Sequence, residues 1–366
     1  MATFMAGALV LNRGIPMDSG SIGSEDWIHR NAVVNGVRLH YVECGSGPLV
    51  ILLHGFPEFW YAWRYQIPVL AAAGYRVIAL DQRGYNVSDK PKGVRHYRLE
   101  ALLDDVLGII HHAGEQSAVV VGHDWGGAVA WNFAMRHPQA VEKLIVLNAP
   151  HPQRFLEEIT TFSQLRKSWY MFLFQLPWLP EMLIRSGDFA GLERTLRIDP
   201  VHPGTFDAVT IAHYKQAIAQ PGALSAAINY YRALFRLNPV TFKRSIMRID
   251  VPTLLIWGEQ DRYLGIRLTE ELKTWVPKLQ LERIPDASHW VQVEVPDQVN
   301  ALMVNFLRTT GEIRPPSETE VTMSLSETEQ PPAKAGGFVL WTKVRIRVIR
   351  PVHVSVLKLS SPLGSK

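Results

Sequence analysis

The chain has 366 residues, of which 47% are hydrophobic and 20% are charged, with a formal net charge of +4. This is an ordinary globular composition, and the length allows one large domain with an insertion. The single cysteine, Cys44, excludes a framework of internal disulfides and is typical of a reducing compartment, so we expect a cytoplasmic protein.

The positive charge is concentrated at the C-terminal end. From Pro331 onward there are seven Lys or Arg and no Asp or Glu, so the rest has 38 − 7 = 31 basic against 34 acidic residues. A mildly acidic main body argues against a nucleic-acid partner. The N-terminal stretch has no basic residue before Arg13, and no apolar run reaches bilayer length. We therefore expect a flexible arm over residues 1–26 and no transmembrane segment.

Strand-like and helical patterns alternate along the chain. "AVVNGVRLHYVEC" predicts a hairpin that turns at Asn35-Gly36. Strand patterns follow in "PLVILLHG", "YRVIALD", "SAVVVGHD" and "KLIVLNAP", and they resume much later in "PTLLIWGEQD" and "LQLERIPDASH". Helical patterns such as "LEALLDDVLGIIHHAG" lie between them. This order predicts the α/β class, with a mostly parallel sheet flanked by helices.

The gap in the strand series predicts an inserted domain. Residues 151–238 are rich in aromatic side chains and helical periodicity, and they contain no convincing strand. We predict a helical cap over 151–238, between two halves of one core, 27–150 and 239–310. Residues 311–366 have the composition of a linker, followed by alternating apolar and basic residues. That last segment fits an edge hairpin, a surface-binding strand or an appendage without a role.

The stretch "VVVGHDWGGAVAW", from Val119 to Trp131, joins a predicted strand to a predicted helix. Its centre matches the sharp strand-to-helix elbow that in its better-known form presents a nucleophilic Ser. Here Asp124 stands at the centre, and the surrounding glycines allow close backbone approach. We expect the turn to present a carboxylate above the sheet, at the N-terminus of the next helix.

A carboxylate suits attack on a saturated carbon. A Ser that attacks such a carbon leaves a nearly inert ether, whereas a carboxylate forms an alkyl ester that water can cleave. A carboxyl group with the ordinary aspartate pKa of about 3.9 is ionised near neutral pH and needs no base to activate it. The expected substrates are therefore epoxides or alkyl halides, and this chemistry calls for no metal and no organic cofactor.

Ester cleavage needs a base for water. His289, in "DASHWVQVEVPDQVN", follows the last predicted strand. Proteins with this kind of elbow carry their catalytic residues in the chain order nucleophile, acid, histidine, so a histidine is expected here. His54 and His123 fit less well, because they belong to neighbouring turns. Asp261, in "LLIWGEQDRYL", follows the preceding strand and is the expected orienting acid. Asp81 is expected to fix its own turn.

The oxyanion that forms during ester cleavage needs N–H donors. "LLHGFPEFW" places a turn directly after another strand. The backbone N–H of Phe56 is therefore expected to pair with that of Trp125 as an oxyanion hole. The same two residues are expected to contact the substrate.

These residues resemble the α/β-hydrolase fold and, within it, the soluble-type epoxide hydrolases, over roughly Trp27 to Leu307. The matching stretches include "HGFPEFWYAWRYQIPVLAAAGYRVIALDQRGYNVSDKP", "VVGHDWGGAVAW", "ASHWVQVEVPDQVN", "SWYMFLFQLPWLPE" and "QPGALSAAINYYR". The resemblance implies two tyrosines that hold the epoxide oxygen. They fall at Tyr170 and Tyr231, with the adjacent Tyr230 as an alternative. Asn86 stands where the family usually has Gly, a change that Asn tolerates because it adopts left-handed backbone readily.

Together these features predict an epoxide hydrolase that converts a hydrophobic epoxide and water into a vicinal diol. Two alternatives remain. A haloalkane dehalogenase shares "GHDWGG", but related dehalogenases often have Asn at the position of Phe56. A non-catalytic ligand-binding protein on the same fold is the other. The expected partners are a small-molecule substrate and water, and the oligomeric state is open.

Overall fold

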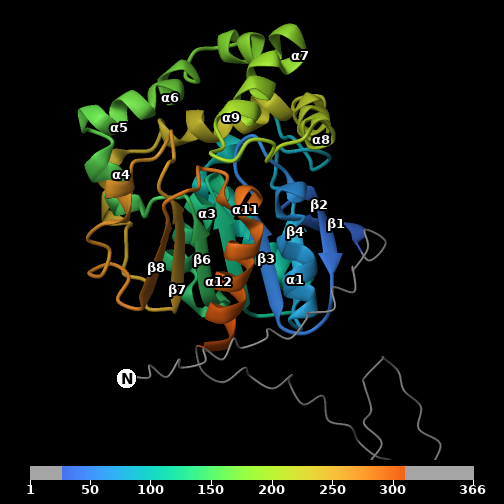
Figure 1. Ribbon diagram of the computed structural model, residues 1–366, viewed down its shortest axis with the longest axis vertical. Coiled ribbons are helices and arrows are strands. Elements are labelled where there is room, and N and C mark those ends of the chain that lie inside the picture. The colour runs from blue at the N-terminus through green and yellow to red at the C-terminus, as the bar shows by residue number, and fades with distance from the viewer. Residues whose placement is uncertain (1–26, 310–366) are drawn as a thin grey trace, which may run out of the picture. The chain divides into compact units, whose positions relative to one another are not determined.

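The computed structural model describes residues 27–309, so the predicted N-terminal arm (1–26) and the predicted linker and tail (311–366) lie outside the described residues. Figure 1 shows a central sheet whose eight strands have the order β1-β2-β4-β3-β5-β6-β7-β8. The strands are β1 (Ile28–Val34), β2 (Val37–Cys44), β3 (Leu49–Leu53), β4 (Arg76–Leu80), β5 (Ala118–His123), β6 (Val141–Leu147), β7 (Thr253–Gly258) and β8 (Leu279–Ile284).

The first two strands form the predicted hairpin. Val34 pairs with Val37 across a two-residue turn in an antiparallel ladder. Asn35 and Gly36 both have positive φ, 49° and 73°, as a turn that matches the twist of the strands requires. The prediction of a hairpin at Asn35-Gly36 is confirmed.

Strands β3 to β8 run parallel, and each predicted strand pattern overlaps one of them; β6 begins two residues before its pattern. β3, β5 and β7 are buried along their whole length, because helices cover both faces of the sheet. The α1 and α12 helices pack on each other, as do α2 and α3, and Figure 1 shows α1 and α12 in front of the strands. These core helices are α1 (Gln66–Ala72), α2 (Leu99–His112), α3 (Trp125–Arg136), α11 (Val291–Glu294) and α12 (Pro296–Thr309).

The chain between β6 and β7 is helical and contains no strand. In Figure 1 these helices gather over one end of the sheet. They are α4 (Pro152–Glu158), α5 (Phe162–Lys167), α6 (Trp169–Leu173), α7 (Leu179–Ile198, interrupted at Ser186–Phe189), α8 (Ala208–Ala219), α9 (Ala223–Leu234) and α10 (Pro239–Arg244). The α10 helix lies past residue 238, within the range predicted for the second half of the core.

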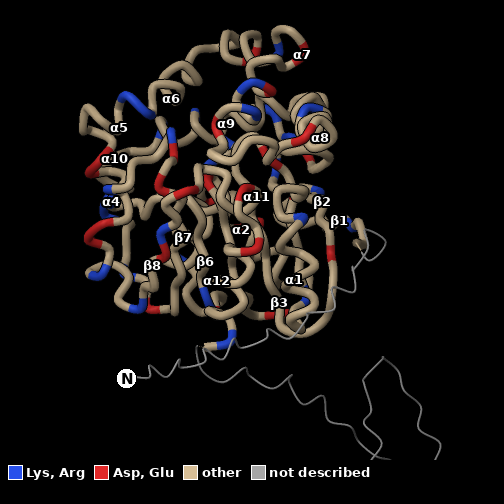
Figure 2. The backbone as a smooth tube through the Cα atoms, viewed as in Figure 1, with Lys and Arg blue, Asp and Glu red and all other residues tan. Residues whose placement is uncertain are grey.

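Charges of both signs are interspersed over the described chain (Figure 2). This distribution differs from the single-sign stripe that favours a nucleic-acid partner. Within residues 27–309, none of the helices combines the length and the apolar character that crossing a bilayer takes.

Candidate active site

Asp124 sits at a strained elbow between β5 and α3. Its φ is 49° and its ψ is −119°, a backbone conformation that non-glycine residues rarely adopt and that costs about 1–3 kcal/mol. The chain around it tolerates no side chain where the sequence has glycine. A Cβ at Gly122 would lie 2.2 Å from the Gly126 carbonyl oxygen, and one at Gly126 would lie 2.0 Å from the Leu53 carbonyl oxygen. The glycines therefore let α3 start close against the sheet and raise the carboxylate above it.

The turn after β3 meets this carboxylate. The backbone N–H of Phe56 donates to Oδ1 of Asp124 over 2.8 Å. A Cβ at Gly55 would lie 2.5 Å from the Cβ of Asp124, so only glycine allows this approach. Trp125 is the first residue of α3, and its N–H is one of those without a partner inside the helix. The structure thus brings both residues of the predicted oxyanion hole beside Asp124.

His289 and Asp261 come from the loops after β8 and β7. His289 Nδ1 lies 2.7 Å from Asp261 Oδ2, and its Nε2 lies 3.7 Å from Asp124 Oδ2. The other Asp261 oxygen, Oδ1, accepts the backbone N–H groups of Tyr263 and Leu264 over 2.7 and 2.8 Å. The orienting acid is therefore fixed by the turn that carries it, and the imidazole stands between two carboxylates.

The surroundings of this buried pair set its charge. Burial lowers the pKa of His289, but the Asp261 carboxylate and, more weakly, Asp124 and Glu58 raise it to about 9. Burial raises the pKa of Asp261, but His289, Asn148 and the Leu264 N–H outweigh it, and the net shift is downward. The pair is thus an imidazolium and a carboxylate near neutral pH.

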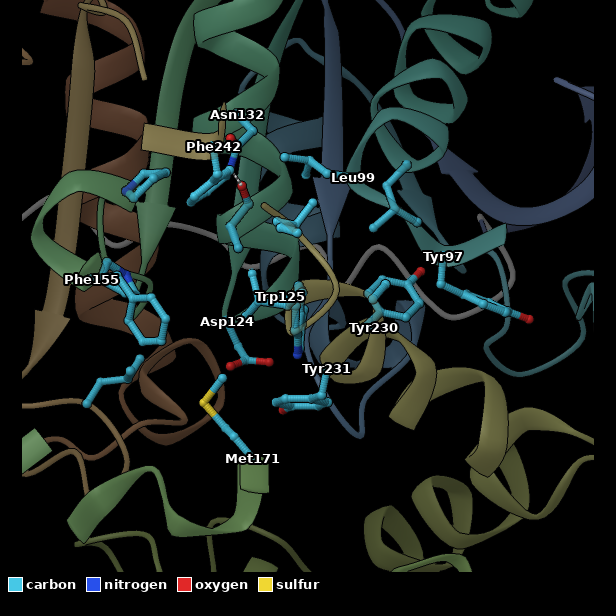
Figure 3. A pocket seen from close by; sticks show the side chains of 18 of the residues that line it. Tyr97, Leu99, Asp124, Trp125, Asn132, Phe155, Met171, Tyr230, Tyr231 and Phe242 are labelled. Carbon is cyan, nitrogen blue, oxygen red and sulfur yellow. Dashed lines mark hydrogen bonds between the residues drawn. The ribbon is translucent and has the colours of Figure 1, made fainter. Parts of the chain in front are cut away.

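Tyr170 of α6 and Tyr231 of α9 line the same cavity and pack edge to face, with ring centroids 5.8 Å apart. Tyr231 also packs edge-on against the Trp125 indole, at 5.0 Å, and Figure 3 shows it beside Asp124 and Trp125. Burial, followed by the charge of Asp124, raises the pKa of Tyr170; burial, Tyr170 and Asp124 do the same for Tyr231. Both phenols therefore stay protonated. Tyr230 differs, since its hydroxyl donates to the Arg83 carbonyl oxygen over 2.8 Å.

A cavity of about 110 Å³ extends from Asp124 along α3 and beneath the helical insertion. Figure 3 shows Trp125, Met171 and Tyr231 around the carboxylate, with Asn132 and Phe242 farther along the cavity. Asp124 is the one charged residue among those that line it, and most of the others are apolar or aromatic. Among residues 27–309, no group of three or more His, Cys, Asp or Glu is arranged to hold a metal ion. The cavity suits an apolar molecule held against a carboxylate.

Comparison with known proteins identifies the family of the chain. Residues 48–296 match the α/β-hydrolase fold family. Epoxide hydrolase 3 of Xenopus tropicalis is 42% identical over 285 residues, which cover 75% of this chain and 76% of that protein. The chain belongs to the epoxide hydrolase family of α/β-hydrolases.

For two further relatives, the match to this chain covers nearly the whole length of the relative. The AB hydrolase superfamily protein YfhM of Bacillus subtilis is 45% identical over 278 residues, 75% of this chain and 96% of that protein. The crystal structure of Bacillus megaterium epoxide hydrolase in complex with an inhibitor superimposes with a TM-score of 0.70 at 33% identity, covering 76% of this chain and 99% of that one. The predicted fold class and family are confirmed.

At Asn86, where the family usually has Gly, the structure shows why Asn is accommodated. Its φ is 43°, in the left-handed region. Its side-chain amide donates to Asp81 over 2.7 Å. Asp81 also accepts the Trp60 N–H and contacts His40, so its bonds lie within its own turn and the neighbouring elements.

Sequence reasoning did not single out Glu58, which is buried beneath the site. One of its oxygens accepts the Gly55 N–H over 3.0 Å and lies 2.7 Å from His123 Nδ1. The other accepts from the Gln292 amide over 3.0 Å. His123 Nε2 lies 2.8 Å from the carbonyl oxygen of His289. A carboxylate within the apolar stretch "HGFPEFW" was the signal that could have found this network.

Proposed function

We propose that this chain hydrolyses apolar epoxides to vicinal diols through a covalent ester on Asp124. The observation that carries the proposal is that the two Asp124 oxygens have different contacts. Oδ1 is held by the Phe56 N–H, while Oδ2 faces His289 across 3.7 Å. These contacts support Oδ1 as the carbonyl oxygen of the ester and Oδ2 as the attacking atom.

In the first step, a lone pair on Oδ2 of Asp124 forms a bond to one epoxide carbon as the ring carbon–oxygen bond breaks. The departing oxygen becomes an alkoxide, which needs a proton. Tyr170 and Tyr231 line the same cavity as Asp124 and have raised pKa values, so they keep their protons until a strong base forms nearby. Both phenols donate hydrogen bonds to the epoxide oxygen, and one of them gives its proton to the alkoxide.

In the second step, water attacks the ester carbon and loses a proton to Nε2 of His289. Negative charge then develops on Oδ1, where the Phe56 N–H already donates and the Trp125 N–H lies at the start of α3. The tetrahedral intermediate collapses, and the bond between the ester carbon and Oδ2 breaks. The proton that remains on the water-derived oxygen passes to the departing oxygen. The diol therefore leaves with the former Oδ2 of Asp124, and the carboxylate regains an oxygen from water.

The protonation of His289 fits this order. The Asp124 charge is one of the causes that raise its pKa to about 9. Ester formation removes that charge, so the imidazolium releases its proton more readily once the ester exists. The released proton restores the phenol that was used in the first step. His289 is then neutral when water needs a base, and the cycle balances without an external acid.

The dehalogenase alternative fits the site less well. A departing halide needs donors but no proton, whereas this site presents two buried phenols that can supply one. The position after Gly55 is Phe56, so the side-chain donor that related dehalogenases often place there is missing. The aromatic and apolar lining of the cavity favours a hydrophobic epoxide.

The experiment that tests the proposal traps the ester. His289→Gln should allow alkylation, because Asp124 needs no base, and should block hydrolysis. Mass spectrometry of the variant after treatment with styrene oxide should show the protein plus one substrate, located on the peptide that contains Asp124. The matched control is Asp124→Asn/His289→Gln, which should remain unmodified. An unmodified His289→Gln protein that still binds the epoxide would contradict the proposal.

A further inference from the structure

The outer surface of the helical insertion carries a group of exposed apolar side chains. The residues that define it, which we name the cap patch, are Phe162, Leu165, Trp169, Phe172, Leu176 and Trp178. Their exposed fractions run from 42% at Leu165 to 82% at Phe162. Among residues 27–309, no stretch of this length outside 162–183 exposes as many large hydrophobic side chains. Soluble proteins rarely expose a large contiguous apolar surface, and such a surface is typical of a site that binds another protein, a membrane or a ligand.

The cap patch spans α5, α6 and the turn before α7. Figure 1 shows these elements in succession along the outer edge of the insertion, and α5 contacts α6. The Phe172 ring lies 5.3 Å from the ring of Phe235, at the end of α9. Phe235 is itself 43% exposed, so the apolar surface continues from α6 onto a neighbouring element.

The free charges beside the cap patch are positive. Between Phe162 and Arg185 the sole acid is Glu181, and its carboxylate is bound by the Arg232 guanidinium at 2.8 Å. Arg166 and Arg185 are exposed in this stretch. Arg236 is exposed next to Phe235. Figure 2 shows the basic segment of α5 beside the uncharged backbone of α6.

We infer that the cap patch is a docking surface for an anionic lipid bilayer. Tryptophan side chains favour the headgroup region, apolar side chains reach the acyl boundary, and flanking arginines attract anionic lipids. A second copy of this chain is a poorer occupant, because it would bring the same cations against the patch. The segment 331–366 also has seven Lys or Arg and no acid, so its charge is not complementary either. The inference concerns binding and does not rest on the proposed function.

The cap patch lies close to the cavity that contains Asp124. Tyr170 and Met171 of α6 line the cavity, whereas their neighbours Trp169 and Phe172 are exposed on the cap patch. One short helix therefore separates the cavity from the surface that would meet lipid. Apolar molecules concentrate in bilayers, so docking would hold the cavity close to the phase that stores apolar substrates.

The test is co-sedimentation of the full chain with vesicles, without substrate, so a failure of catalysis cannot affect it. The wild-type protein should bind vesicles of phosphatidylcholine and phosphatidylglycerol in equal parts, and bind pure phosphatidylcholine more weakly. Trp169→Ser/Trp178→Ser should lower the partition coefficient about tenfold or more, because two large apolar side chains that docking would remove from water are lost. The matched control, Val33→Ser/Val209→Ser, removes two exposed apolar side chains from β1 and α8 and should bind like the wild type.

A second pair of variants separates charge from apolar contact. Arg166→Gln/Arg185→Gln should weaken binding to the mixed vesicles and leave binding to pure phosphatidylcholine almost unchanged. Circular dichroism checks that each variant is folded. Three results would overturn the inference: no binding by the wild type, equal binding by the tryptophan variant, or a concentration-dependent dimer that the same tryptophan substitutions abolish. The second result would assign binding to residues outside the patch, and the third would assign the patch to self-association.

Discussion

The side-chain amide of Asn148 donates to Oδ2 of Asp261 over 2.8 Å, and the same oxygen lies 2.7 Å from Nδ1 of His289. Asn148 directly follows β6, and its own Oδ1 accepts the Gly258 N–H over 2.9 Å. An amide at the end of one strand and an acid beyond the end of the next therefore meet at one point beside the imidazole. From this geometry we expect that an acid at the end of either strand reaches the imidazole.

Moving the acid tests that idea. Asp261→Asn should slow ester hydrolysis by roughly a thousandfold or more, because the imidazole loses the carboxylate that orients it and stabilises its charge. Adding Asn148→Asp should raise the rate of ester hydrolysis about tenfold or more above that of Asp261→Asn, since a carboxylate again borders the same ring nitrogen. Single-turnover hydrolysis rates of the two variants measure the effect. A double variant no faster than Asp261→Asn would show that the end of β6 cannot hold the acid.

The pKa of His289 should depend on both carboxylates. Asp261 and Asp124 contribute to raising it to about 9, so Asp261→Asn and Asp124→Asn should each lower it, the first by more. Asp124→Asn also imitates the uncharged ester, so it reports the state in which His289 must act as a base. Titration of the imidazole by nuclear magnetic resonance measures each value. An unchanged pKa in Asp124→Asn would remove the explanation for the timing of proton release.

The same shift predicts how stability depends on pH. His289 binds its proton more tightly when folded, with a pKa of about 9 against about 6.5 in an unfolded chain. Its contribution to the free energy of unfolding is therefore fully present below about pH 6.5 and is lost as pH rises through about 9. Denaturant melts across this window should show a smaller decline in Asp261→Asn than in the wild type. Equal declines in the two proteins would mean that other groups account for most of the stability lost at alkaline pH.

Sequence patterns predicted the strands and the elbow well because both depend on local rules. Buried parallel strands appear as continuous apolar runs, and the Asp124 elbow needs glycine at fixed offsets. The contacts of Asn148 and Glu58 escaped prediction, because they join turns from different strands and no short-range pattern encodes that meeting. The predicted end of the helical insertion at residue 238 stays a prediction, since α10 follows directly and no strand pattern before β7 marks a boundary.

The two phenols should act in alkylation and not in hydrolysis. Tyr170→Phe or Tyr231→Phe should slow ring opening by about a hundredfold, the usual cost of losing one such donor, and the double variant should be nearly inactive. Tyr230→Phe is the matched control, since that hydroxyl donates to the Arg83 carbonyl oxygen. Rapid quenching separates ester formation from ester loss. A double variant that opens epoxides at the parent rate would show that both tyrosines only contribute packing, and it would favour the dehalogenase alternative.

Glu58 is predicted to position the turn that carries Phe56. Burial raises its pKa, but His123 and the Gly55 N–H lower it, with a net downward shift, so the buried side chain is ionised. Glu58→Gln keeps the shape and removes the charge. It should slow ester hydrolysis about tenfold or more while alkylation falls less, because the Phe56 N–H matters most when the oxyanion forms. Glu157→Gln, on the more exposed side of α4, is the control, and an equal loss in both steps would indicate a purely structural role.

The most direct test of the ester mechanism follows one oxygen atom. The full chain, in excess over its epoxide, completes a single turnover in water labelled with heavy oxygen, and the diol and the Asp124 peptide are analysed by mass spectrometry. The ester mechanism predicts an unlabelled diol and one labelled oxygen in the Asp124 carboxylate, because Oδ2 leaves with the product and water replaces it. A labelled diol from that first turnover, with an unlabelled Asp124, would show that water attacks the epoxide directly.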